Sequence, residues 1–150
     1  MVRRYHVTLM NRIAGCALVG LALTLNLGTA TADVVAVVSS TSTVTTLSKA
    51  QVVDIFLGKV SRFPDGTPAV AIDHAEGSPV RDEFYVAYAG KSPAQVKSHW
   101  AKIIFTGRGQ PPKAVSSDSE IRKLIAANPQ AISYLDRSAV DSSVKVLLQP

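Results

Sequence analysis

The residues best suited to chemistry lie between Asp73 and Tyr85, where an apolar, strand-like run leads into a Gly-Ser turn and a helical pattern. Ser78 stands at the expected helix N-cap, with Pro79 at the first helical position, where a missing N–H group costs no hydrogen bond. Gly77 allows the tight turn before them. A helix start gathers unpaired N–H groups at the positive end of the helix dipole, so a small anion can bind there. The same pattern is also typical of a helix that is only well capped.

Neighbouring side chains extend this candidate anion site. Arg81 lies one turn into the helix, where its guanidinium can hold an oxyanion bidentately or pair at the surface with Asp82 or Glu83. His74 is a poorer partner for an oxyanion than a permanent cation such as arginine. Two serines follow a predicted strand end, where open α/β sheets commonly contact ligands, although such a loop is equally consistent with no contact. The predicted anion-binding residues are therefore Gly77, Ser78, Arg81, His74, Ser39 and Ser40.

Other chemistry is not indicated by the remaining residues. His74 and His99 are scattered without the spacing of a zinc site, and the chain has no G-x-S-x-G turn of a hydrolase. The only cysteine, Cys16, precedes the predicted mature chain. We therefore expect no cofactor, no metal and no enzyme activity. A basic loop, Gly107-Arg108-Gly109 followed by Lys113, is a second choice for anion contacts and is also typical of a plain connection.

The first 32 residues have the pattern of a secretory leader. Three arginines in the first twelve residues precede an apolar run of 15 positions, 13–27, and Ala30-Thr31-Ala32 is a cleavage signal. Such a run is shorter than the roughly 20 residues that span a bilayer. We expect export and cleavage before Asp33, which gives a soluble periplasmic protein. Ile13-Ala14-Gly15-Cys16 also resembles a lipoprotein box, although most of the apolar run follows Cys16 rather than preceding it.

Removal of this leader changes the charge of the protein. Three of the 16 basic residues lie in the leader and all 11 acidic residues lie after it, so the mature net charge is only +2. A value so close to neutral gives no indication of nucleic-acid binding. The mature chain has 118 residues and no cysteine, so a hydrophobic core rather than disulfides must stabilise it.

Strand-like and helix-like patterns alternate along the mature chain. Short β-branched runs indicate strands buried on both faces, and serine caps introduce amphipathic helices. The predicted strands are Val34–Val38, Pro68–Ile72, Ala131–Leu135 and Ser143–Leu148, and the predicted helices are Lys49–Leu57, Pro79–Ala89, Pro93–Phe105 and a segment capped by Ser117 that ends near Ala127. This alternation predicts one α/β domain over residues 33–150, with a mixed sheet of about four strands flanked by helices.

Three segments of this domain resemble the phosphate-binding proteins that serve ABC importers. Leu47–Lys59 contains the distinctive Ile-Phe-Leu-Gly-Lys, Asp73–Phe84 looks like the family's phosphate loop, and Gln130–Leu135 resembles one of its strands. The resemblance implies a type II periplasmic binding protein fold, with about one of that family's two lobes present. It also implies phosphate or a similar oxyanion as the ligand, and a transporter or envelope sensor protein as the partner.

The phosphate loop departs from the family pattern at several positions. Against the family's approximate Arg-Ser-Asp-Gly-Ser-Gly-Thr, this chain has His74 in place of the arginine, Pro79 in place of the second glycine and Val80 in place of the threonine. Pro79 lacks an N–H group and Val80 lacks a hydroxyl, so two donors to phosphate are lost. The expected function is weak, non-enzymatic phosphate binding, unless a second copy in a homodimer or another partner closes the site. The alternative is an interaction module whose ligand site has decayed and which binds another envelope protein.

Overall fold

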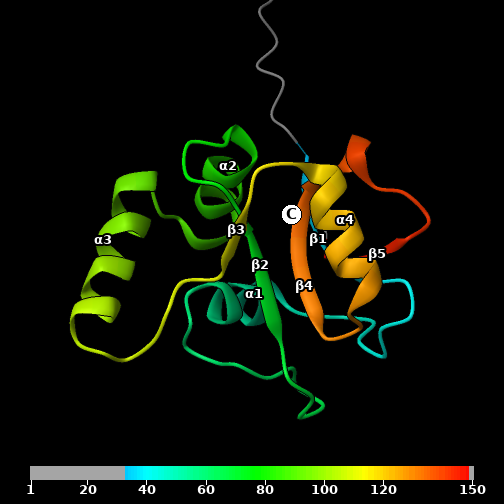
Figure 1. The fold of residues 1–150 in the computed structure, drawn as a ribbon, viewed down its shortest axis with the longest axis horizontal. Helices are drawn as coiled ribbons and strands as arrows, with labels where there is room; N and C mark the ends of the chain where they lie inside the picture. Colours follow the sequence, from blue (N-terminus) through cyan, green and yellow to red (C-terminus); the bar gives the residue numbers. More distant parts are fainter. Residues whose placement is uncertain (1–32, 149–150) are drawn as a thin grey trace, which may run out of the picture. The chain divides into compact units, whose positions relative to one another are not determined.

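We describe residues 33–148 of the protein from a computed structural model, so the predicted leader and Cys16 lie outside the described residues. The helices are α1 (Lys49–Phe56), α2 (Pro79–Ala89), α3 (Pro93–Phe105) and α4 (Asp118–Ala127), with a short 3-10 turn at Arg137–Ala139. The strands are β1 (Val34–Ser39), β2 (Val70–His74), β3 (Lys113–Val115), β4 (Ala131–Asp136) and β5 (Val144–Leu148) (Figure 1). None of these helices is long and apolar enough to cross a membrane.

A five-stranded mixed sheet forms the centre of the domain, in the order β3-β2-β4-β1-β5. β2 is parallel to β3 and to β4, whereas β1 is antiparallel to β4 and to β5. The predicted α/β class is confirmed, and four of the strands lie close to their predicted positions. β3 is one strand more than the sequence predicts, because three residues after a proline-rich loop are too few to show an alternating pattern.

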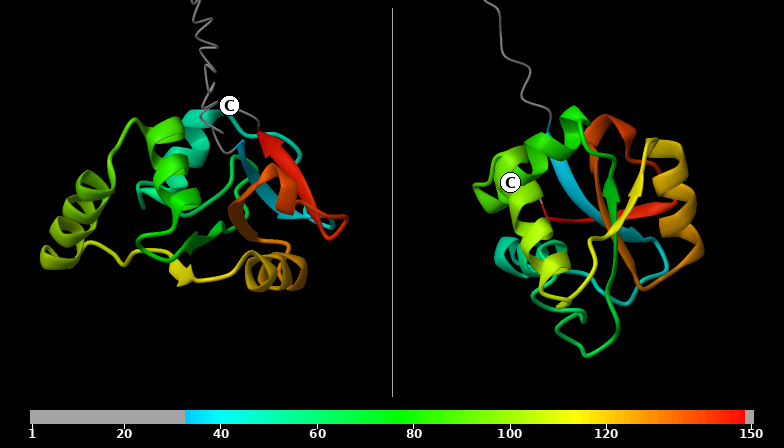
Figure 2. Two further views of the ribbon diagram at one scale, coloured as in Figure 1. Left: turned by 90° about the horizontal axis from the view of Figure 1, so that it is seen from above. Right: turned by 60° about the vertical axis from the view of Figure 1, so that its left-hand side comes forward.

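β1 divides the apolar interior into two cores. All six of its residues are buried, as an unbroken β-branched run predicts. Because successive side chains of a strand point to opposite faces, Val34, Ala36 and Val38 belong to the core that also contains residues of α1, α2 and α3, while Val35 and Val37 belong to the core beneath α4. Figure 2 shows α4 on one side of the sheet and α1 with α2 on the other.

The end of α1 is tied to α3 by close contacts. Gly58 has φ 70°, and a Cβ atom added there would lie 2.7 Å from Cη2 of Trp100. The neighbouring His99 places Nε2 2.9 Å from the carbonyl oxygen of Leu57, which can only accept, so Nε2 is the donor. These contacts fix the relative position of the two helices at this point.

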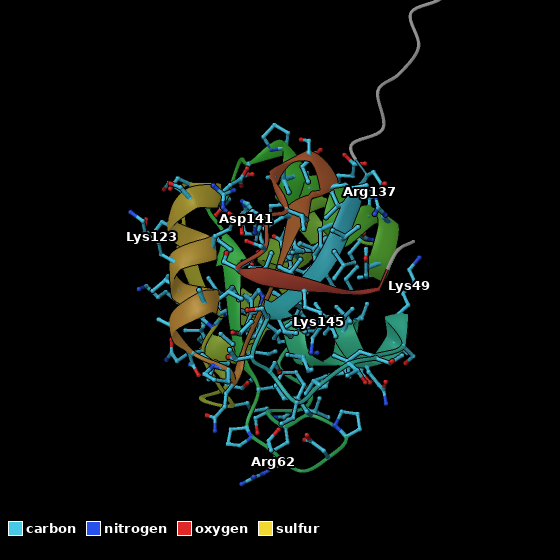
Figure 3. The ribbon with its side chains drawn as sticks, turned by 90° about the vertical axis from the view of Figure 1, so that its right-hand side faces the viewer. Lys49, Arg62, Lys123, Arg137, Asp141 and Lys145 are labelled. Carbon is cyan, nitrogen blue, oxygen red and sulfur yellow. The ribbon has the colours of Figure 1, made fainter. Side chains whose placement is uncertain are left out.

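Charged side chains near β5, at the edge of the sheet opposite β3, already have partners. Arg122 Nε lies 3.0 Å from Asp141 Oδ2, and Lys145 donates to the carbonyl of Ser42 at 2.8 Å. Lys123 on α4 points away from the domain (Figure 3).

Candidate anion-binding site

A buried carboxylate, Asp73, organises the region where the anion site is predicted. Asp73 is the last but one residue of β2 and is 3% exposed. It accepts hydrogen bonds from Tyr85 Oη at 2.8 Å, from Tyr134 Oη and from Arg81 Nε at 3.3 Å. Burial, reinforced by the charge of Asp73, raises the pKa of both tyrosines far above the usual 10.0. Both hydroxyls therefore stay protonated and act as donors that join β2 to α2 and β4.

Arg81 belongs to this cluster and does not pair with Asp82 or Glu83. Its side chain is 11% exposed, with the guanidinium 5.1 Å above the ring of Tyr85. Burial disfavours the charged guanidinium, but the Asp73 carboxylate, helped by the tyrosines, outweighs burial and raises the pKa of Arg81. Arg81 donates to Asp73 through Nε. Among residues 33–148, no acceptor is hydrogen-bonded to its terminal Nη atoms.

A cavity of about 330 Å³ lies beside this cluster, at the carboxyl end of β2 and next to the prolines that lead into β3. Arg81, His74 and Asp73 line it, together with Lys97 and Trp100 of α3 and with Glu76. Lys97 Nζ lies 2.9 Å from Glu76 Oε1, and this hydrogen bond and the lysine charge lower the pKa of Glu76. The cavity thus combines two cations with two carboxylates in the place where ligands commonly contact an α/β sheet.

The start of α2 lies next to this cavity and lacks a side-chain cap. Gly77 has φ 86°, and Ser78 is extended, with no hydrogen bond from its hydroxyl to the helix. The serines that begin α1, α3 and α4 each accept a backbone N–H, at 3.2 to 3.3 Å. Since first-turn N–H groups have no partner inside a helix, those of Val80 and Arg81 are left for an external acceptor.

His74 has a structural position at the same end of β2. β2 and β4 pair only at Val70 and Ala71, and side chains continue their contact beyond that point. Ser133 Oγ donates to the carbonyl of Ile72 at 2.7 Å, and Nε2 of the buried His74 lies 2.9 Å from the carbonyl of Tyr134. Nδ1 of His74 lies 3.8 Å from Asp118 Oδ1. The ring is therefore held through Nε2, while Nδ1 faces the Asp118 carboxylate beyond hydrogen-bond distance.

The fold brings together four of the six predicted anion-binding residues: Gly77, Ser78, Arg81 and His74. Ser39 ends β1 and Ser40 follows it in a turn. β1 runs antiparallel to β4, whereas β2 runs parallel to β4. Both serines consequently lie at the opposite end of the sheet, where Ser39 bonds Thr41 and Ser40 donates its N–H to the carbonyl of Ser143. The position of these two serines depends on the direction of β1 in the sheet, which the hydrophobic pattern of the sequence does not reveal.

Sequence reasoning missed the residues that complete the site: Asp73, Tyr85, Tyr134 and Lys97. An acidic residue at the end of an apolar strand is a usable signal for Asp73. Tyr85 follows Arg81 by one turn of α2 and could have been placed on the same helix face. Tyr134 and Lys97 reach the site through the packing of β4 and α3, for which the sequence carries no local signal. Among the described residues, no group of His, Cys, Asp and Glu is arranged to hold a metal ion.

No protein-family model and no curated protein matches this chain, whereas solved structures do. One, described as a phosphate ABC transporter substrate-binding protein from Clostridium perfringens with bound phosphate, aligns with a TM-score of 0.62 and 22% identity over 77% of this chain and 44% of its own. A phosphate transport receptor from Vibrio cholerae gives 0.61 and 20%, over 77% and 45%. A Planctomyces limnophilus protein, described as phosphate binding, gives 0.57 and 15%, over 77% and 40%. The fold is that of one lobe of a type II periplasmic binding protein.

The lobe spans less than half the length of each of these three structures. The structural resemblance predicted from the Ile-Phe-Leu-Gly-Lys helix, the Gly-Ser turn and the Gln130–Leu135 strand is confirmed at the level of the fold. Because the sequence identities are only 15% to 22%, the comparison supports the fold alone.

Proposed function

We propose that this lobe binds small oxyanions such as phosphate, without catalysis, at the start of α2 and beside Arg81. The observation that carries the proposal is that Arg81 is anchored by Asp73 through Nε, which leaves its terminal nitrogens for a ligand. The uncapped helix start adds the Ser78 hydroxyl and two backbone N–H groups within one turn of it. In support, the three solved structures are described as phosphate transport or phosphate-binding proteins.

Binding by a single lobe is expected to be weak. Gly77 is exposed, so water competes for the anion and screens its charge. Pro79 offers no N–H group, and the Asp73 and Glu76 carboxylates repel an anion in the cavity. These effects predict a dissociation constant on the order of 1 mM for phosphate.

The leader pattern supports a periplasmic site of action. We infer that the mature protein meets its ligand there, and that a transporter or envelope sensor receives it. A second copy facing the α2 start would exclude water from the site and strengthen its charge-assisted hydrogen bonds.

Calorimetric titration of residues 33–150 with phosphate at low salt tests the proposal. Ser78→Ala should weaken binding several-fold, because it removes a donor that serves no cap. Lys123→Gln, which removes an exposed charge on α4, should leave binding unchanged. A submicromolar dissociation constant for a monomer would show that the second lobe and the lost donors are unimportant.

Absence of binding at tens of millimolar phosphate would favour the alternative, an interaction module. Phe105, at the end of α3, is 93% exposed and Ile104 is 48% exposed, which is the observation that supports a protein-docking surface.

A further inference from the structure

Positive charge is concentrated in one stretch of the mature chain. Residues 91–117 contain five Lys or Arg and no Asp or Glu. Cations elsewhere in residues 33–148 are mostly engaged, as in Arg81 with Asp73 and Arg122 with Asp141. The described cations without an ion pair, a side-chain hydrogen bond or a ring contact are Lys91, Lys102, Arg108, Lys113 and Lys123. Four of these five lie in residues 91–117.

Two of these uncompensated cations meet in a cleft between the end of α1 and α3. Lys102 and Arg108 line a cavity of about 310 Å³ together with Lys59, and the part-buried Ile103 gives it an apolar wall. A second cavity of about 410 Å³ shares Lys59 and Arg108, so Arg108 borders both hollows. Neither cavity is lined by Gly77, Ser78 or Arg81.

The walls of this cleft are held by hydrogen bonds to backbone carbonyls. The hydrogen bond between His99 and the carbonyl of Leu57 joins α3 to the end of α1. The N–H group of Arg108 donates to the carbonyl of Ile103 at 3.0 Å, and Gly107, with φ 65°, makes the turn that this bond requires. A ligand therefore finds the site formed and has to order only the long side chains of the cations.

We propose that this cleft binds an organic anion: a phosphate monoester or carboxylate whose apolar part rests on Ile103. Lys102 and Arg108 supply charge that no carboxylate within residues 33–148 pairs with, whereas Lys59 is shared with Asp54 at 2.9 Å. A bare inorganic anion would use the cations alone and leave the apolar wall in water. An anion with an apolar group uses both, because burial of that group adds to the charge-assisted contacts.

The test uses 1-naphthyl phosphate and 1-naphthoate as probes, with inorganic phosphate and the neutral 1-naphthol for comparison. In NMR titrations of residues 33–150, both naphthyl anions should shift the amide signals of Gly58, Lys59 and Gly107. The double variant Lys102→Gln, Arg108→Gln should raise their dissociation constants about tenfold or more. The matched variant Lys91→Gln, Lys123→Gln has the same net charge and should change them less than twofold.

The same titrations separate this site from the one at α2. Ser78→Ala should leave binding of 1-naphthyl phosphate within twofold, even if it abolishes phosphate binding. Equal weakening by the two double variants would overturn the proposal in favour of nonspecific charge attraction. Shifts confined to Gly77 and Ser78, or equal binding of 1-naphthol, would overturn it as well.

Discussion

Asp73 shows how one residue can link three elements of the domain. Its carboxylate receives Arg81 and Tyr85 from α2 and Tyr134 from β4, all in a buried setting. A buried charge of this kind is stable only while its partners remain, because each group left alone would be charged or polar without hydration.

Replacing Asp73 with alanine is expected to lower the free energy of unfolding by about 3–5 kcal/mol, because Arg81 would stay buried without a counter-charge. Arg81→Met added to Asp73→Ala should recover part of this loss, since it removes the unpaired cation. Urea unfolding at pH 7 measures both. A loss below about 1 kcal/mol for Asp73→Ala would mean that the cluster does not hold α2 to the sheet.

Gly58 is expected to be intolerant of any side chain. Gly58→Ala combines a left-handed backbone, which costs about 1–2 kcal/mol, with a collision against the Trp100 ring. Gly66→Ala is the matched control, because Gly66 has φ 86° and open space around it. The urea midpoint should fall further for Gly58→Ala than for Gly66→Ala, and equal midpoints would show that Trp100 moves aside without cost.

At the scale of elements, the four helix starts differ in what their serines do. Ser92→Ala should destabilise the domain by about 0.5–2 kcal/mol, because it removes a capping box from α3. Ser78→Ala should change stability little, since that hydroxyl caps nothing. Thermal unfolding of both variants compares them, and an equal loss would mean that Ser78 acts as a cap in solution.

Three turns make the stability of the domain sensitive to acid. Asp65, Asp136 and Asp141 accept hydrogen bonds from the hydroxyl and N–H groups of Thr67, Ser138 and Ser143, and these bonds lower the pKa of each carboxyl below 3.8. A lowered folded-state pKa stabilises the protein above the unfolded-state value, and this contribution is lost as pH falls through the folded-state values.

Urea midpoints measured from pH 7 downward should therefore stay level until about pH 4 and fall below it. Asp136→Asn with Asp141→Asn should flatten this fall, because asparagine can keep the turn and does not titrate. If the urea midpoint of that variant falls below pH 4 as steeply as before, other carboxyl groups cause the loss of stability.

The helices and most strands could be predicted because their signals are local. Ser92-Pro93 and Ser78-Pro79 mark helix starts wherever they occur, and the five β-branched or small residues from Val34 indicate a buried strand. The contents of the site could not be predicted in the same way. Tyr134 reaches Asp73 across 61 residues of chain, and the direction of β1, which removes Ser39 from the site, is set by pairing with β4.

At the scale of the whole molecule, the anion sites that we propose occupy different parts of the lobe. The α2 start uses groups that the Asp73 cluster positions, and the cleft at Arg108 uses charge that the rest of the domain leaves unneutralised. The domain net charge of +2 conceals this separation, since residues 91–117 carry +5 and the remainder of the mature chain is acidic. Binding of anions should thus depend on salt much more strongly than the net charge suggests.

The central place of β1 in the sheet limits how early this protein can fold as its chain emerges N-terminus first. β1 is made first among the strands, yet both of its hydrogen-bonded neighbours, β4 and β5, are made last. Until residues 131–148 have emerged as well, an apolar strand lacks its sheet neighbours and remains exposed to chaperones or to self-association. A fragment of residues 33–130 should accordingly show no cooperative unfolding transition, and a folded, monomeric fragment would mean that α1, α2 and α4 shelter β1 without its sheet.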